Sequence, residues 1–379
     1  MKRALLGVLK RSAWLAIPMP LPILWACNEA PVEADHRTLV LAGGPTCEDC
    51  EIVVNEVAVL GHPDDPASVA ANPSARCRLG RLSTGEFVSS GLIGGETVLV
   101  YGSTGRAIRS IGRAGKGPGE FGRDLRIVGS GDTLVVVDRR RRQVVRMDVL
   151  GNYLDSFLLD WPLWNSARLP NGTLVFSTEA SFDDYGFRLV KVVDQRGNLI
   201  ASHDRVSSDL VNLMMPDMDG RRVAPAVSGS YWTGIRWTCE LHRWATPGRR
   251  DLVVIRDAEC FRPNRPQSVE DVDAWYTTEP PPRDVFHVRE TSDGLLWTYS
   301  QVPDNRWQPG PEPDDVPSLH RSLDTMVEVI DIADGSVVAQ RRLDERLGAV
   351  CDGSDFMTTV REMPDGDTRT IVLRLALSR

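Results

Sequence analysis

The sequence contains no segment with the pattern of a long helix. No stretch combines a 3.6-residue hydrophobic period with helix caps at both ends, and the longest apolar run is too short for a comfortable membrane span. Aromatic content is unremarkable at 7% of the 379-residue chain. The lack of a helical pattern argues against α-helical and α/β folds and leaves an all-β chain as the expectation.

Motifs of the common enzyme classes are also missing. There is no G-x-S-x-G elbow and no H-E-x-x-H, and the six histidines are scattered along the chain. Residues 117–122 match G-x-G-x-x-G, but strand-like residues follow where a dinucleotide site needs a helix N-terminus. We therefore expect no cofactor, and the sequence identifies no catalytic residue.

Acidic residues outnumber basic ones, 52 to 44. The formal net charge is -8, and residues 1–26 hold four basic residues and no acid, so the rest of the chain carries -12. A chain this acidic repels phosphate backbones, and we expect no nucleic-acid partner. The run from Arg139 to Arg142 is the local exception, which we interpret as a solvated hairpin tip, with a polyanion site as the alternative.

The N-terminus has the features of an export signal. A basic leader precedes an apolar run, Ser12 to Ala26, which ends in Leu24-Trp-Ala-Cys27 and resembles the lipobox of bacterial lipoproteins, although Trp25 departs from the usual small residue. The resemblance implies acylation of Cys27; the alternative is an ordinary cleaved signal with an incidental cysteine. We predict a lipoprotein signal peptide over 1–26, a tether over 27–45 and a folded domain over 46–379. The expected location is the cell envelope, with an outer-membrane anchor facing the periplasm or the surface.

What the chain has in abundance is short β-rich runs bounded by turns. Strand-like segments such as Ile52 to Leu60 and Thr133 to Val137 recur throughout, and Gly105, Gly151 and Gly197 mark turns spaced 46 residues apart. A second glycine turn precedes each of these units. A period of 40 to 50 residues with several strands per unit is typical of propeller blades.

The count of units favours six four-stranded antiparallel blades over seven. Five units have both turns, and the C-terminal piece stops one strand short. The strand Ile52 to Leu60 lies ahead of the first unit and supplies the missing one, so that the N-terminal strand closes the ring inside the C-terminal blade and hides two edges. We expect a monomer.

Six cysteines remain once Cys27 is set aside, an even number that suggests disulfides in an oxidising compartment. Cys239 and Cys260 flank the turn at Gly248, and we predict that they pair. Cys47 and Cys50 favour a structural disulfide over zinc or redox chemistry, but the sequence leaves their pairing with Cys77 and Cys351 open.

The glycine-rich stretch from Ile111 to Phe121 resembles a sequence motif of bacterial six-bladed β-propeller lipoproteins, which are relatives of NHL-repeat propellers. Val137-Asp138 and the segment from Cys47 to Val53 fit the same family. The resemblance covers residues 46–379, is weak from 205 to 290, and implies a fold and an envelope location but no catalytic residues. We interpret the stretch as a joint between two blades, formed by Gly112, Gly115, Gly117, Pro118, Gly119 and Phe121.

Three long connections interrupt the repeat: 204–222, 262–283 and 303–320. They carry Trp275, Tyr276 and Trp307, and loops on a rigid scaffold are common binding sites. We therefore expect a module that binds a protein, peptide or glycan, unless these aromatic side chains only cap the propeller edge. The alternatives are a metal-dependent hydrolase or lactonase of the gluconolactonase-like propeller type and a structural envelope scaffold.

Overall fold

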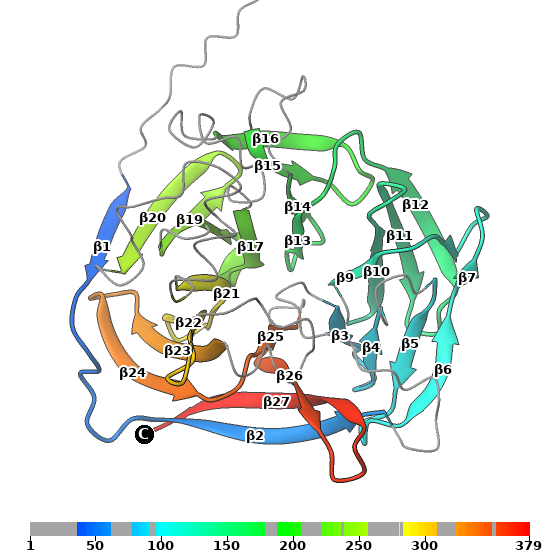
Figure 1. The fold of residues 1–379 in the computed structure, drawn as a ribbon. Helices are drawn as coiled ribbons and strands as arrows, with labels where there is room; N and C mark the ends of the chain where they lie inside the picture. The colour runs from blue at the N-terminus through cyan, green and yellow to red at the C-terminus, as the bar shows by residue number, and fades with distance from the viewer. Residues whose placement is uncertain are drawn as a thin grey trace, which may run out of the picture. The chain divides into compact units, whose positions relative to one another are not determined.

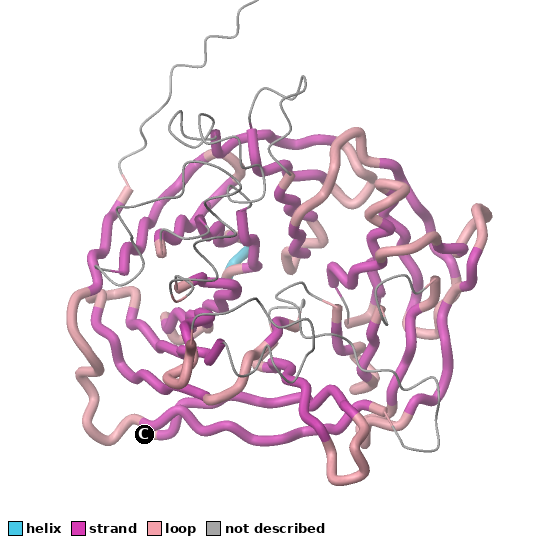
Figure 2. Tube along the Cα trace, viewed as in Figure 1, coloured by secondary structure: helices cyan, strands magenta, loops and turns pink. Residues whose placement is uncertain are grey.

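The computed structural model describes residues 36–61, 78–90, 96–129, 131–178, 188–205, 221–235, 239–256, 280, 283–308, 323–350 and 354–379. The described residues all belong to one compact unit, and residues 1–35 lie outside the described part of the chain. The predicted signal peptide and Cys27 therefore lie outside the part of the chain that the structure describes. In the described part, Figure 2 shows strands throughout and one short 3-10 helix, η2 (Val227–Gly229).

The strands form six blades arranged in a ring, which is the predicted architecture (Figure 1). Blade 1 consists of β3 (Leu79–Arg81), β4 (Phe87–Ser89), β5 (Val98–Tyr101) and β6 (Ala107–Ile111), and blade 2 of β9 (Leu125–Gly129), β10 (Thr133–Asp138), β11 (Gln143–Asp148) and β12 (Tyr153–Leu158). Blade 3 consists of β13 (Asn165–Arg168), β14 (Leu174–Ser177), β15 (Arg188–Val193) and β16 (Leu199–Arg205), and blade 4 of β17 (Arg221–Pro225), β18 (Tyr231–Ile235), β19 (Glu240–Thr246), β20 (Arg249–Arg256) and β1 (Arg37–Leu41). Blade 5 consists of β21 (Asp284–Glu290), β22 (Leu295–Pro303), β23 (Leu323–Asp331) and β24 (Ser336–Leu343), and blade 6 of β25 (Gly348–Ala349), β26 (Phe356–Glu362), β27 (Thr368–Ser378) and β2 (Glu51–Leu60).

Blade 6 combines β2, from the N-terminal part of the described chain, with the three C-terminal strands. β2 pairs antiparallel with β27 from Glu51 opposite Ser378 to Leu60 opposite Thr370, and β26 and β25 complete the sheet towards the centre. Ile52 and Leu375 are both buried in the same apolar cluster. The N-terminal and C-terminal strands therefore stabilise each other within one blade.

The predicted tether needs a correction. Residues 37–41 form β1, which pairs parallel with β20 and adds a fifth strand to the outside of blade 4 (Figure 1). Leu39 and Leu41 are buried against blades 4 and 5, whereas Val40 between them is 63% exposed. This alternation of buried and exposed residues is that of a strand with one apolar face, so the propeller domain begins before residue 46.

The turn glycines adopt the backbone conformation that the repeat predicts. Gly105, Gly151 and Gly197 all have φ between 86° and 90°, in the left-handed region that side chains with a Cβ rarely adopt. The glycines of the preceding turns, such as Gly85 and Gly131, do the same. The 46-residue spacing in the sequence therefore corresponds to equivalent turns in successive blades.

The core is divided among the junctions between blades. Along β10, Val136 packs in the cluster shared with blade 1, while Val135 and Val137 pack in the cluster shared with blade 3. Each of the six junctions has one such apolar cluster among the described residues. A strand with both faces buried is apolar at every position, and this accounts for the continuous run Leu134 to Val137.

Candidate functional site

The two faces of the propeller differ in what connects their strands. All six inner strands, β3, β9, β13, β17, β21 and β25, begin at one face because the strands within each blade alternate in direction. We call this the loop face. The opposite face, which we call the turn face, carries the tight glycine turns at Gly85, Gly105, Gly151, Gly197 and Gly335.

The three long connections predicted to bind a ligand begin and end on the loop face. The described strand ends that they join are those of β16 and β17, of β20 and β21, and of β22 and β23. Trp307 is half-buried beside the last of these, where its backbone N–H donates to the Asp304 carbonyl oxygen at 3.0 Å. Trp275 and Tyr276 lie outside the described residues, so their part in a binding site stays a prediction.

The glycine-rich stretch joins blade 1 to blade 2 on this face. It leaves β6 at Ile111, forms the short parallel pair β7 (Arg113–Ala114) and β8 (Glu120–Phe121), and enters β9 at Leu125. Phe121 is fully buried in the apolar cluster between the two blades. Gly112 has φ of +75°, and a Cβ there would lie 2.3 Å from the Phe121 ring. The stretch is therefore a closely packed connection.

The anion cradle that the glycines suggest is occupied by a side chain of the stretch itself. The Glu120 carboxylate accepts hydrogen bonds from the Gly117 backbone N–H at 2.7 Å and from Arg113 Nε at 2.8 Å. These donors lower the pKa of Glu120; the hydrogen bond from the Gly117 N–H is the largest cause, and Arg113 adds a second hydrogen bond and its positive charge. A Cβ at Gly115 would lie 1.9 Å from Glu120 Oε2, so the glycine makes room for the carboxylate. This local arrangement leaves no space for a phosphate.

The arginine run forms the tip of the β10–β11 hairpin on the loop face and contacts the joint. Arg139 Nη1 lies 2.8 Å from Asp124 Oδ2, and the buried Asp138 carboxylate accepts from the Gly122 N–H at 2.7 Å and from the Arg141 N–H at 3.1 Å. Two of the four arginines thus have structural partners, which the interpretation as a solvated tip did not anticipate.

Several cations of this region still face solvent. Lys116, Arg140 and Arg142 are exposed. Residues 112–124 and 138–142 contain seven basic and three acidic residues, a local net charge of +4 on a chain of net charge -8. All three acidic residues, Glu120, Asp124 and Asp138, accept hydrogen bonds within the region. We call Lys116, Arg140 and Arg142 with their surroundings the basic patch.

Arginines also mark the starts of the inner strands, a feature that the sequence interpretation missed. Those flanking or opening β3, β9, β17, β21 and β25 are Arg78, Arg126, Arg221, Arg222, Arg283 and Arg346. All but Arg346 are buried. Arg222 Nη2 lies 3.2 Å from Asp284 Oδ2 of the next blade, and Arg283 pairs with Glu328. The signal in the sequence was an arginine at the start of five of the six inner strands, and this signal becomes visible only once the blade register is known.

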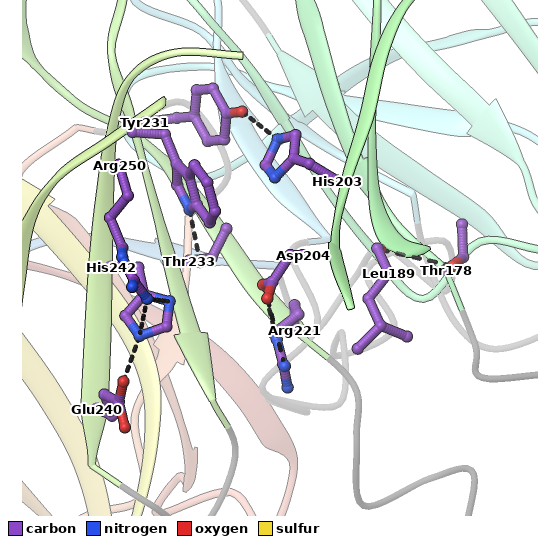
Figure 3. A network of polar contacts seen from close by, with 11 residues as sticks. Thr178, Leu189, His203, Asp204, Arg221, Tyr231, Thr233, Glu240, His242 and Arg250 are labelled. Carbon is purple, nitrogen blue, oxygen red and sulfur yellow. Dashed lines mark hydrogen bonds and ion pairs between the residues drawn. The ribbon is translucent and has the colours of Figure 1, made fainter. Parts of the chain in front are cut away.

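A polar network fills the junction between blades 3 and 4 (Figure 3). Near the loop face, Arg221 Nε lies 2.8 Å from Asp204 Oδ2. Deeper in the junction, His203 bonds to the Tyr231 hydroxyl and stacks near the Trp244 ring, with centroids 4.2 Å apart. Burial raises the pKa of Tyr231, and the Asp204 charge adds to the effect. These contacts hold the strands that flank one of the long connections.

The network continues across blade 4. Trp244 Nε1 donates to Thr233 Oγ1 at 2.9 Å, and His242 bonds to Glu240 (Figure 3). The His242 bond is the first cause of a lowered pKa at Glu240, which Arg250 and Arg221 lower further. Because these side chains are engaged with one another, we assign the network to holding the junction together.

The cysteines are partly described. Cys47 and Cys50 form a disulfide just ahead of β2, with an S–S distance of 1.94 Å, and this bears out the structural disulfide expected there. Cys239 is disulfide-bonded. Cys77, Cys260 and Cys351 lie outside the described residues, so the pairing of Cys239 with Cys260 stays a prediction.

Two further features were sought among the described residues. They contain no group of three or more His, Cys, Asp or Glu side chains placed to hold a metal ion. They also contain no helix long and apolar enough to cross a membrane.

Comparison with known proteins supports the fold. Residues 91–206 match a family model described as 6-bladed beta-propeller. No protein of curated function matches the chain in sequence. A protein of Bacteroides fragilis described as exported is similar over 90% of this chain and 100% of its own, with a TM-score of 0.59 and 10% identity. A Bacteroides vulgatus protein is similar over 87% of this chain and 99% of its own, with a TM-score of 0.58 and 10% identity. Such identities show a shared fold, and the predicted resemblance to six-bladed propellers is confirmed at that level.

Proposed function

We propose that this six-bladed propeller is an exported, envelope-anchored module that binds an anionic ligand on its loop face. The observation that carries the proposal is the basic patch: Lys116, Arg140 and Arg142 are each exposed on the loop face of an otherwise acidic protein. Exposed cations raise the local concentration of anions and favour their binding. The loop face is also where the long connections begin and end, and such loops commonly carry binding residues.

The anionic group is a carboxylate, phosphate or sulfate of a glycan or a peptide. Arginine recognises all three through paired N–H donors. The Glu120 carboxylate, held by Arg113 and the Gly117 N–H, shows this chemistry within the joint itself. Salt should weaken the binding, because exposed charges more than about 10 Å apart are largely screened at 0.1 M ionic strength.

Charge reversal tests the ligand site. The triple variant Lys116→Glu, Arg140→Glu, Arg142→Glu should lose binding to arrays of uronic-acid, sulfated and phosphorylated glycans and acidic peptides by tenfold or more. The matched control reverses three exposed arginines in turns of the turn face, Arg106, Arg196 and Arg249, with the same change in net charge. Equal loss of binding in both variants would show a non-specific charge effect and contradict the proposal. The proposal would also be contradicted if the wild-type protein bound only neutral glycans on the arrays.

The anchor has a separate test. Cys27 follows Leu24-Trp-Ala in the pattern of a lipobox, and the similar Bacteroides fragilis protein is described as exported. Replacing Cys27 with Ser should move the protein from the membrane fraction to the soluble periplasmic or secreted fraction. Unchanged membrane association of the Cys27→Ser variant would contradict lipid anchoring while leaving the ligand site open to test.

A further inference from the structure

The fourth strand of every blade, counted from the centre of the ring, contains one extra residue at an equivalent place. On β6, Ala107 and Arg109 pair with the adjacent residues Tyr101 and Val100 of β5, so that Ile108 is a β-bulge. The register is interrupted in the same way at Leu154 of β12 and Ile200 of β16. These three residues are 46 positions apart. The equivalent bulges of the other three blades are Asp251, Val338 and Val57.

The bulge residues of blades 1 to 3 are large, apolar and exposed. Ile108 is 52%, Leu154 48% and Ile200 52% exposed. Of the exposed large apolar side chains among the described residues, those on blades 1 to 3 lie on or just before the outer strands: Ile108, Leu150, Tyr153, Leu154, Leu158, Leu199 and Ile200. Exposed apolar side chains gathered on one part of a surface are a feature of interaction sites.

The other half of the rim carries a segment of the chain itself. We call residues 37–60 the N-terminal strap; it pairs with β20 of blade 4, passes blade 5 and becomes the outer strand of blade 6 (Figure 1). On blade 5 the Thr46 N–H donates to the Val337 carbonyl at 2.8 Å and the Cys47 N–H to the Val338 carbonyl at 3.4 Å. Val338, the bulge residue there, is only half-buried and packs against the core between blades 5 and 6. The strap shows that this rim binds an extended polypeptide at a bulge.

We propose that the rim of blades 2 and 3 binds an extended segment of a partner protein in the way that blades 4 and 5 bind the N-terminal strap. β12 and β16 end their sheets, with no further strand beside them among the described residues. An added strand would use their outward N–H and C=O groups and place apolar side chains against Leu154 and Ile200. A lipid surface would cover the apolar side chains but leave the strand edge without hydrogen-bond partners, so the polypeptide is the better fit.

The experiment selects peptides from a random 12-residue display library on the purified full-length protein. Selected peptides should bind the wild type at least tenfold more tightly than the variant Leu154→Glu, Ile200→Glu. Hydrogen exchange of the β12 and β16 amides should slow when the peptide is bound. Both substituted side chains are about half exposed, and Leu154→Ser, Ile200→Ser replaces the pair if the charged variant does not fold.

Val40→Glu serves as the matched control, because Val40 is an exposed apolar residue of similar size on the strap itself, and this variant should bind the peptides normally. Selected peptides that bind the Glu double variant equally well would overturn the proposal. It would also be overturned if the bound peptides slowed hydrogen exchange in strands other than β12 and β16. Binding of phosphatidylcholine vesicles but of no peptide, lost in the Leu154→Glu, Ile200→Glu variant, would overturn it as well. If the wild-type protein dimerises through Leu154 and Ile200, the rim binds a second copy of this chain and not a partner protein, and the proposal is overturned.

Discussion

At the scale of single residues, the joint between blades 1 and 2 depends on glycines for two distinct reasons. Gly112 needs both a left-handed backbone and the absence of a Cβ, because the Phe121 ring occupies that space. Gly366 has a similar φ of +84°, but no atom lies within 4 Å of the place where its Cβ would be. The two positions therefore separate backbone strain from packing.

We predict that Gly112→Ala lowers the free energy of unfolding by about 3 kcal/mol, because it combines left-handed strain with overpacking against Phe121. Gly366→Ala should cost only about 1 kcal/mol, since the strain acts alone. Urea unfolding followed by tryptophan fluorescence measures both. Equal losses in the two variants would mean that the contact with Phe121 is relieved by movement and does not constrain the joint.

At the residue scale the sequence predicted turns better than sites. The positive φ at Gly105, Gly151 and Gly197 follows from a local need for glycine that repeats at a constant spacing. The Glu120 carboxylate inside the glycine-rich stretch was not predictable, because a G-x-G-x-x-G pattern does not reveal which anion fills it. Arg222 and Asp284, which pair between blades, are 62 residues apart and lie outside the regular part of the repeat.

At the scale of elements, the N-terminal strap is the main departure from expectation. The segment Arg37 to Leu41 follows no turn of the repeat, and five residues are too few for a periodic signal to stand out. Its place is decided by pairing with the edge of β20 and by the apolar cluster in which Leu39 and Leu41 are buried. Tertiary packing of this kind is beyond what local sequence encodes.

The strap should contribute to stability through its buried face only. We predict that Leu41→Ala lowers the free energy of unfolding by about 2 to 4 kcal/mol, because Leu41 is 1% exposed in the core between blades 4 and 5. The neighbouring Val40→Ala should change it by less than about 0.5 kcal/mol, since Val40 is 63% exposed. Chemical denaturation measures the free energy of unfolding of both variants. If β1 were only a loosely attached tail, neither substitution would change this free energy.

At the scale of the whole molecule, the ring of blades contains buried ionisable groups that tie its stability to pH. His287 on β21 is fully buried, and burial, assisted by the charge of Arg289, lowers its pKa to about 3. In the unfolded chain the same imidazole has a pKa of about 6.5. Below that pH the unfolded state takes up a proton that the folded state refuses, so acid favours unfolding.

We therefore predict that stability is highest above pH 6.5 and falls as the pH is lowered towards 3, with His287 adding up to about 1.4 kcal/mol per pH unit. His287→Gln removes this contribution, so the free energy of unfolding of the variant should depend less steeply on pH between 6.5 and 4. Denaturation midpoints at several pH values measure the difference. Parallel pH profiles for the two proteins would show that His287 is not held neutral.

Closure of the ring has a consequence for the order of events during synthesis. Glu51 lies opposite Ser378, so the strand that completes blade 6 waits for a partner made more than 300 residues later. Contacts of such long range slow folding, because the chain loses much entropy before they form. Until β27 emerges, the edge of β2 stays open to unrelated strands. A chain that crosses a membrane N-terminus first would therefore be most prone to aggregation just before its last thirty or so residues arrive, and chaperones that shield strand edges would matter most at that stage.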